Sequence, residues 1–194
     1  MPHVYPNWFL PLAEPNFKRY LMRYTALPVR FLQIGAFTGD ASEWLLTNVL
    51  THPDSELVDL DTWAGSQEDA HRYFDWKDVE ETYDAKVKPF RNVTKVKMTS
   101  DEYFASLPSE EQFNFIYVDG AHDALQVLRD GMNGFDHLKV GGILIFDDYF
   151  WRSGRGPFYE PEHGIEAFRK IYSQFLKVLE MNYQVWIQKT SEIA

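Results

Sequence analysis

The sequence predicts a single α/β domain, spanning residues 1–194, built around a mostly parallel sheet. Short apolar runs alternate with segments of helical periodicity, which is the pattern of strands and helices in a doubly wound sheet. Several of these runs stop at a glycine or an aspartate, as buried parallel strands do. A length of 194 residues with 45% hydrophobic residues fits one domain with one sizeable core.

Residues 1–28 are expected to form an arm and a short helix that cover a site. Residues 1–16 are rich in proline and aromatic side chains, which indicates an irregular segment that wraps the domain. A short helix is predicted near residues 17–24, and Pro28 ends it.

Five apolar runs are predicted to be buried parallel strands, because they are short and are bounded by turn residues or charges. In chain order they cover residues 30–34, 56–60, 93–98, 113–118 and 143–146, the last opened by Gly141 and Gly142. Two β-rich runs near the C-terminus, separated by Met181 and Asn182, predict an antiparallel hairpin at the edge of the sheet.

Helices are predicted between the strands. Asp40 and Ser42 are good N-cap residues in front of an apolar helical face, so a helix should follow the first strand directly. An apolar stripe from Ala124 to Phe135 predicts a longer helix. Further helices are predicted over residues 101–107 and 165–175.

Two segments are expected to be insertions near the site. Residues 64–90 are polar, charged and aromatic, with only weak helical periodicity. Residues 149–163 are expected to form a lid over the bound substrate, because aromatic rings can stack on an apolar substrate and glycines permit hinge motion. These residues are Phe150, Trp151, Phe158, Gly154 and Gly156. An ordinary surface loop packed by its own aromatic side chains is the alternative.

The loop after the first strand is placed to bind a ligand. In an open α/β sheet, ligands bind beyond the carboxyl ends of the strands, where glycine loops and helix N-termini leave backbone donors free. Gly35 and Gly39 lie in such a loop, although the same pair also suits a tight turn without a ligand. A dinucleotide motif is disfavoured because Phe37 stands where G-x-G-x-x-G needs its second glycine, and the sequence contains no G-K-[ST].

Two further motifs make the pattern specific. Residues 118–122 read V-D-G-A-H, and residues 141–149 read G-G-I-L-I-F-D-D-Y. Together with the glycine loop and with Asp61 after the second strand, they resemble class I S-adenosylmethionine-dependent methyltransferases, most closely the small-molecule, metal-dependent O-methyltransferases. The resemblance covers nearly the whole chain from Arg30 onward. It implies a Rossmann-like, seven-stranded, mostly parallel sheet in the order 3-2-1-4-5-7-6, with an antiparallel C-terminal edge hairpin and helices on both faces.

The resemblance implies that S-adenosylmethionine is the cofactor. Asp61 looks like the acid that accepts both ribose hydroxyls. Ser100 and Asp101 stand where the family contacts adenine, and either residue also suits the N-cap of the next helix. Gln33 stands where the family usually has an acid, so it offers a hydrogen bond without a charge. The cofactor-binding residues implied are Gln33, Gly35, Ala36, Gly39, Asp61, Ser100, Asp101 and Asp119.

A divalent metal is predicted at Asp119, Asp147 and Asp148, which follow the fourth and fifth strands. These strands are neighbours in the expected order, and three converging carboxylates would repel one another without a cation. Oxygen ligands favour Mg²⁺, with Mn²⁺ or Ca²⁺ as alternatives. The metal would lower the pKa of an acceptor hydroxyl and orient it. Alternatively, Asp147 and Asp148 only cap the turn.

The expected reaction is methylation of a hydroxyl oxygen on a small molecule. Asp119 and His122 are the predicted catalytic residues, because an imidazole can accept the hydroxyl proton near neutral pH. His122 could instead orient Asp119 or cap the following helix. Two other functions stay open: a non-catalytic S-adenosylmethionine-binding scaffold, and methylation of a nitrogen acceptor.

Composition narrows the partners. Nineteen basic and twenty-nine acidic residues give a formal net charge of −10, which disfavours nucleic acid and anionic membrane surfaces. The sequence has no cysteine, which excludes thiolate metal sites and thiol nucleophiles. It shows neither a signal-peptide pattern nor an apolar run long enough to span a membrane, so a cytoplasmic protein is expected. A small hydroxylated acceptor is the expected partner, and a homo-oligomer stays open.

Overall fold

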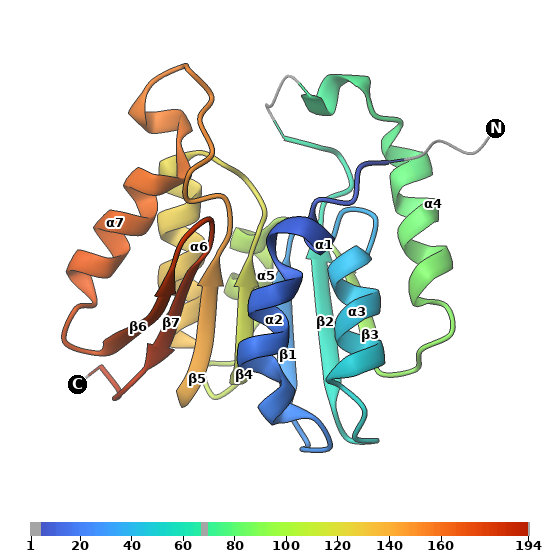
Figure 1. Cartoon of the computed structure of the whole chain (residues 1–194), viewed down its shortest axis with the longest axis horizontal. Helices are drawn as coiled ribbons and strands as arrows, with labels where there is room; N and C mark the ends of the chain where they lie inside the picture. The colour runs from blue at the N-terminus through green and yellow to red at the C-terminus, as the bar shows by residue number, and fades with distance from the viewer. Residues whose placement is uncertain (1–4, 67–69, 194) are drawn as a thin grey trace.

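A seven-stranded sheet forms the centre of the fold (Figure 1). The structure, a computed structural model, describes residues 5–66 and 70–193. Residues 1–4 of the expected arm, residues 67–69 of the expected insertion and Ala194 lie outside the described residues. The strands are β1 Arg30–Ile34, β2 Glu56–Asp61, β3 Val93–Lys97, β4 Phe113–Val118, β5 Leu138–Phe146, β6 Leu176–Met181 and β7 Val185–Lys189.

The strand order is β3-β2-β1-β4-β5-β7-β6, which confirms the order that the resemblance implies. β1 to β5 pair in parallel, whereas β7 pairs antiparallel with both β5 and β6. The edge hairpin predicted from the C-terminal sequence is therefore also confirmed.

Helices cover both faces of the sheet, as expected. Figure 1 shows α2 and α3 in front of the sheet and α5 and α6 behind it. Each face has its own buried apolar cluster, since neighbouring strand residues such as Phe31 and Leu32 point to opposite sides. The helices and 3-10 turns are α1 Phe9–Leu12, α2 Glu14–Leu21, η1 Met22–Tyr24, α3 Asp40–Asn48, η2 Ala70–Tyr73, α4 Trp76–Val87, α5 Ser100–Ser106, α6 Ala124–Asp136, η3 Pro157–Tyr159 and α7 Pro161–Ile171.

The strand register brings the chemically active residues to one edge of the sheet. Ile34 pairs with Leu60 on one side and with Val118 on the other, and Val118 pairs with Phe146. Four parallel strands therefore end at the same level. The residues at or just beyond these ends are Gly35, Asp61, Asp119 and Asp147.

The N-terminal arm is more helical than its sequence predicts. Phe9 is buried and packs edge-to-face on Phe17, with ring centroids 4.9 Å apart, and both rings contact Trp44. The helix expected at residues 17–24 begins at Glu14, with Pro15 in its first turn, where a missing N–H costs nothing. Proline there starts a helix instead of preventing one.

Residues 64–90 contain a regular helix that their weak periodicity did not predict. Asp75 caps α4 by accepting hydrogen bonds from the N–H groups of Lys77 and Asp78. Val79, Tyr83 and Val87 repeat at four-residue spacing and are buried against α3 and the sheet. Only the first part of the expected insertion, up to Trp76, reaches the cavity described below.

Several predicted boundaries need correction. Gly39, with a φ of 80°, is the N-cap of α3, so neither Asp40 nor Ser42 caps that helix. Thr99 caps α5 through a reciprocal pair of bonds with Glu102, which removes the capping role considered for Ser100 and Asp101.

Two elements near the C-terminal half also start earlier than predicted. β5 begins at Leu138, which pairs with Phe113 before a register shift. α7 begins at Pro161 and ends at Ile171, four residues before each predicted end. None of the described helices is long and apolar enough to cross a membrane.

Candidate functional site

A cavity of about 800 Å³ lies at the carboxyl edge of the parallel strands. Its wall comes from the loops after β1 to β5, from the N-terminal arm and from Tyr183 in the β6–β7 turn. This is the edge where open α/β sheets bind ligands, and the volume is in the usual range of roughly 300–1,000 Å³ for small-molecule sites. The predicted site residues can therefore be placed relative to one cavity.

The glycine loop after β1 touches the loop after β4. A Cβ atom on Gly35 would lie 2.0 Å from the carbonyl oxygen of Asp119, and its φ of 89° also favours glycine. The Asp119 N–H donates to the Ile34 carbonyl at 2.9 Å. The expected cofactor loop and the first expected metal ligand are therefore fixed against each other.

Two other predicted loop residues occupy different positions. Ala36 lines the cavity. Gly39 does not, and its closest neighbour is the Tyr83 ring, 3.0 Å from the place of an added Cβ. Gly39 therefore shapes the loop from behind.

Asp61 is held at the cavity wall by backbone donors. Its Oδ2 accepts from the Phe37 N–H at 2.9 Å, and its Oδ1 accepts from the Trp63 N–H at 2.7 Å. Each carboxylate oxygen keeps further acceptor capacity. The side chain is thus oriented and can still accept hydroxyl groups from a ligand.

Gln33 lies in the same wall but is only 2% exposed. Its Nε2 donates to the Gly35 carbonyl at 3.1 Å, and its Oε1 accepts from the Ser42 hydroxyl at 3.4 Å. The amide therefore fastens the glycine loop to α3.

Ser100 and Asp101 lie at another part of the wall, where α5 meets α6. The Gln126 Nε2 donates to the Ser100 Oγ at 3.1 Å, and Arg129 pairs with Asp101 at 3.3 Å. Asp130 is 1% exposed and also lines the cavity. Sequence reasoning missed Gln126 and Asp130; the available signal was an acid within the apolar stripe of α6.

The two acids after β5 have different surroundings. Asp147 accepts hydrogen bonds from the Tyr117 hydroxyl, from Gln184 Nε2 at 2.9 Å and from the Asp148 N–H at 2.8 Å. Asp148 accepts from the Tyr183 hydroxyl at 2.6 Å. Protein donors therefore contact both oxygens of Asp147.

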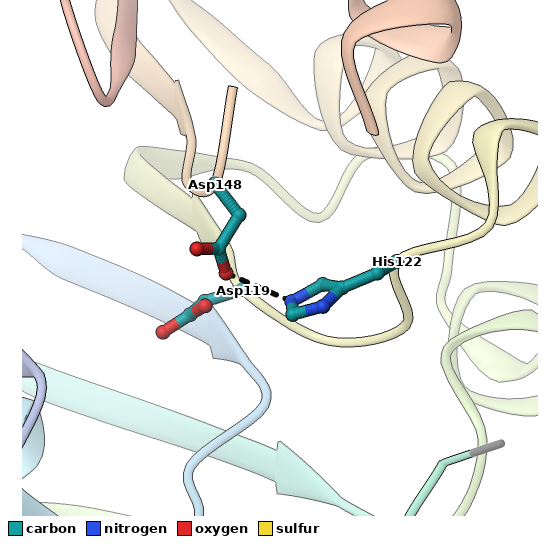
Figure 2. A group of neighbouring side chains, drawn as sticks. All are labelled: Asp119, His122 and Asp148. Carbon is teal, nitrogen blue, oxygen red and sulfur yellow. Dashed lines mark ion pairs between the residues drawn. The ribbon is translucent and has the colours of Figure 1, made fainter. Parts of the chain in front are cut away.

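Asp148 faces the predicted catalytic histidine. Its Oδ2 lies 2.8 Å from His122 Nε2, and Figure 2 shows the Asp119 carboxylate beside this pair. Asp148 has a φ of 59°, a left-handed conformation that costs about 1–2 kcal/mol in a non-glycine residue. Backbone strain of this kind is often found at functional sites.

The residues that could share a metal ion differ in one member from the predicted set. One ligand atom each from Asp119, His122 and Asp148 lie within 4.8 Å of one another. Asp147 is replaced in this group by His122, because the Asp147 carboxylate is turned toward Tyr117 and Gln184.

Negative charge in this cluster is unfavourable without a counter-charge. Burial raises the pKa of Asp119 well above its usual value, and the charges of Asp147 and Asp148 raise it further. Burial, with the charge of Asp148, also raises the pKa of Asp147 to about 6. A bound cation or a proton would relieve this repulsion.

His122 does not cap the helix that follows it. The N-cap of α6 is Asp123, whose carboxylate accepts from the Gln126 N–H at 2.9 Å, so the capping role considered for His122 is wrong. The imidazole instead lies against the Trp151 ring, with centroids 4.7 Å apart.

The predicted lid contributes to the cavity only in part. Trp151 and Phe158 line the cavity, whereas Phe150 packs edge-to-face on Tyr149 outside its wall. Gly154 and Gly156 have positive φ values of 69° and 105°, with nothing within 4 Å of an added Cβ. Opening of this segment stays a prediction.

Comparisons with known proteins identify the family and the fold. A family model described as a methyltransferase domain matches residues 32–149, more than half of the chain. A protein from Clostridium thermocellum, assigned as an rRNA methylase, has a TM-score of 0.69 at 11% identity, covering 93% of this chain and 98% of its own. The O-methyltransferase TomG from Streptomyces achromogenes, in complex with SAM, has a TM-score of 0.65 at 15% identity, covering 94% and 82%.

A third solved structure contains a metal. The methyltransferase MycE of the mycinamycin biosynthetic pathway, in complex with Mg, SAH and mycinamycin VI, has a TM-score of 0.66 at 14% identity. The match covers 97% of this chain and 51% of that one. At such identities the three structures show the shared fold alone. A search of curated proteins gives no match.

Proposed function

Because the chain belongs to a family of methyltransferase domains, we propose that it transfers the methyl group of S-adenosylmethionine to a hydroxyl oxygen of a small molecule, with assistance from a divalent cation. One observation carries the proposal. The group formed by Asp119, His122 and Asp148 lies in the wall of the same cavity as the Gly35 loop, and Gly35 is in contact with Asp119.

The cofactor half of the proposal rests on Gly35, Asp61 and the α5–α6 wall. Gly35 lets the glycine loop pack directly against Asp119 at the cavity wall, and Asp61 is preoriented to accept ribose hydroxyls. Asp61 at the end of β2 pairs with Lys97 at the end of β3, and Ser100 follows β3 in the chain. A ligand that contacts both Asp61 and Ser100 would therefore cross the ends of two neighbouring strands. TomG and MycE, which have the same fold, are described in complex with SAM and SAH respectively.

Methyl transfer to oxygen requires alignment and loss of a proton. A bond forms between the acceptor oxygen and the methyl carbon while the carbon–sulfur bond breaks, so the sulfonium becomes a thioether and the hydroxyl proton must leave. The protein's task is to hold the oxygen in line with the methyl group and to stabilise its developing negative charge. Asp119, beside Gly35, lies between the part of the cavity assigned to the cofactor and the part assigned to the acceptor.

Asp119, His122 and Asp148 are suited to hold a cation. Their ligand atoms are close together, and burial, with the charges of Asp147 and Asp148, raises the pKa of Asp119, so a cation at this position would stabilise its ionised form. A bound divalent ion would supply Lewis-acid polarisation of the acceptor hydroxyl. Mg²⁺ is the proposed ion, and Mn²⁺ is the alternative because an imidazole nitrogen suits a transition metal better.

His122 has a second candidate role as the general base. Its Nε2 is 2.8 Å from Asp148, so the carboxylate could orient the ring for proton acceptance. His122→Asn separates the two roles, because an amide oxygen can still ligate a metal but cannot accept the proton. Retained metal-dependent turnover in this variant would favour the ligand role.

Two other functions are tested by the same assays. A non-catalytic scaffold would bind the cofactor without turnover, and a nitrogen-directed enzyme would methylate amines. The Clostridium thermocellum relative is assigned as an rRNA methylase, but a net charge of −10 disfavours RNA here.

The direct test combines binding with an acceptor screen. Titration calorimetry should detect S-adenosylhomocysteine binding to the purified chain. Methyl-labelled S-adenosylmethionine should then transfer label to phenols, sugars or other hydroxylated compounds more readily than to matched amines or RNA. A chain that binds no S-adenosylhomocysteine would contradict the cofactor assignment, and transfer only to nitrogen would contradict the acceptor assignment.

A further inference from the structure

The turn between β6 and β7 reaches the cavity from a hairpin that the sequence placed only at the edge of the sheet. Residues 182–184 separate the two strands, and Tyr183 is the residue of this turn that lines the cavity. The Tyr183 carbonyl accepts from the Tyr149 N–H at 2.9 Å, which ties the turn to the chain that follows β5. The turn is therefore held beside Asp148.

Hydrogen bonds within and around the turn fix its backbone. The Asn182 N–H donates to the Gln184 carbonyl at 2.9 Å, and the Gln184 N–H donates to Asn182 Oδ1 at 3.0 Å. The buried Gln184 side chain accepts at Oε1 from Asn16 Nδ2 at 3.1 Å and from Trp186 Nε1 at 3.0 Å. Tyr183 is thus presented to the cavity from a fixed position.

The Tyr183 hydroxyl gives the two oxygens of Asp148 different neighbours. It donates to Asp148 Oδ1 at 2.6 Å, whereas Oδ2 lies 2.8 Å from His122 Nε2 (Figure 2). The last torsion of an aspartate side chain is only broadly restrained, so a donor at one oxygen decides where the other oxygen points. A hydrogen bond to an ionised carboxylate is also stronger than one between neutral groups.

The backbone of Asp148 needs the same support. Its φ of 59° is a left-handed conformation that a non-glycine residue keeps only where its surroundings hold it. Tyr183 supplies two such contacts, because its hydroxyl bonds to the Asp148 side chain and its carbonyl bonds to the next N–H in the chain, that of Tyr149. Loss of the hydroxyl would leave the carboxylate free to rotate.

We propose that Tyr183 is a positioning residue whose hydroxyl holds Asp148 Oδ2 toward His122 and so raises the affinity of the Asp119–His122–Asp148 group for a divalent cation. The inference rests on the proposed function, which places a cation at this group. Residues that hydrogen-bond to metal ligands typically change metal affinity by about 10- to 100-fold when they are replaced.

Binding of Mn²⁺ alone tests this role. Electron paramagnetic resonance measures free Mn²⁺ during titration of the metal-free protein, without cofactor or acceptor. Tyr183→Phe removes the hydroxyl and keeps the ring, so the dissociation constant for Mn²⁺ should rise about 10- to 100-fold. The dissociation constant for S-adenosylhomocysteine, measured by calorimetry on the same preparation, should stay within about twofold. That second value also reports whether the variant is folded.

A matched variant makes the same change on the outer side of the hairpin. The Tyr20 hydroxyl also donates to a carboxylate, Glu180 Oε2 on β6 at 3.1 Å, but Tyr20 lies outside the cavity wall. Tyr20→Phe should therefore keep the wild-type affinity for Mn²⁺ within about twofold. Tyr183→Leu also lacks the hydroxyl, and it tests the proposal if Tyr183→Phe does not fold.

The outcomes distinguish the inference from its premise. A wild type that binds S-adenosylhomocysteine but no Mn²⁺ would overturn the metal part of the proposed function, and the inference with it. Unchanged Mn²⁺ affinity in folded Tyr183→Phe or Tyr183→Leu would overturn the role of Tyr183 alone. Equal losses of Mn²⁺ and S-adenosylhomocysteine affinity would also overturn it, because they would show that Tyr183 supports the cavity in general. A Tyr183 that only contacts the acceptor would leave the binding of Mn²⁺ alone unchanged.

Discussion

The two ends of the cavity hold their carboxylates in different ways. At the β1–β2 end, Asp61 is fixed by the backbone N–H groups of Phe37 and Trp63. At the β4–β5 end, Asp147 and Asp148 are fixed by side chains, including Tyr117 and Tyr183. Backbone donors orient a single charge at little cost, whereas the β4–β5 end concentrates several buried charges that repel one another. The first end presents an oriented acceptor of hydrogen bonds, and the second presents carboxylates whose mutual repulsion a cation or a proton would relieve.

Gly35→Ala should have the largest effect, because Gly35 joins the two ends. Its added Cβ would collide with the Asp119 carbonyl in a backbone conformation that is also strained, so the free energy of unfolding should fall by about 3 kcal/mol or more. Gly141→Ala has a similar φ of 84° but open space, and should cost only about 1–2 kcal/mol. Urea denaturation measures both; equal losses would mean that contact between the two ends contributes nothing.

Asp148→Asn should separate the two ends functionally. Loss of one charge from the Asp119–His122–Asp148 group should lower methyl transfer by about 100-fold, while affinity for S-adenosylhomocysteine stays within about twofold. Steady-state turnover and calorimetry on the same preparation provide the two numbers. A parallel loss of binding would show that the ends are not independent.

Asp61→Ala should produce the opposite pattern. S-adenosylhomocysteine binding should weaken by about 1.5–3 kcal/mol, the usual contribution of hydrogen bonds to a charged group. Turnover at saturating S-adenosylmethionine should change much less. Asp54→Ala, at an exposed acid before β2, is the matched control and should leave binding unchanged. If Asp61→Ala binds as tightly as this control, Asp61 is not the ribose acceptor.

Replacing Asp59, a buried residue of β2 behind the cavity wall, tests whether an unfavourable buried charge also destabilises this side of the protein. Burial raises its pKa to about 7, although Tyr83 donates to it at 2.8 Å. The folded state therefore binds this proton more tightly than the unfolded state, so stability falls as pH rises from about 4 to about 7. Asp59→Asn should remove this part of the slope and stabilise the protein at pH 8 by about 1–2 kcal/mol. Urea denaturation at pH 5 and pH 8 measures the difference, and parallel wild-type and variant curves would contradict it.

The contrast between the two ends of the cavity also explains which features the sequence could predict. The strands and the placement of Gly35 and Asp61 follow from local patterns, since apolar runs and glycine turns act over a few residues. The strand order follows from the resemblance to the methyltransferase family and not from these patterns. α4 was missed because the polar residues around Val79 and Tyr83 weaken its periodicity. Proline in the N-terminal arm was misleading because its effect depends on whether it falls in a first helical turn.

The acid cluster depends on tertiary contacts that no local pattern contains. Sequence reasoning placed Asp119, Asp147 and Asp148 at one edge, and the fold does bring them there. The sequence could not show which acid faces His122. Asp147 is turned away from His122 by hydrogen bonds from Gln184 and Tyr117, which lie at the ends of other strands. The positive φ of Asp148, which lies beside His122, is likewise invisible in the sequence.

Chelation tests the central claim most directly, namely that one end binds the cofactor and the other end needs a cation. After exhaustive EDTA treatment and removal of the chelator, the protein should bind S-adenosylhomocysteine with unchanged affinity but transfer no methyl label to a hydroxylated acceptor, and Mg²⁺ or Mn²⁺ should restore transfer. Full transfer by the metal-free protein would contradict the claim and leave the His122–Asp148 pair as the proton acceptor.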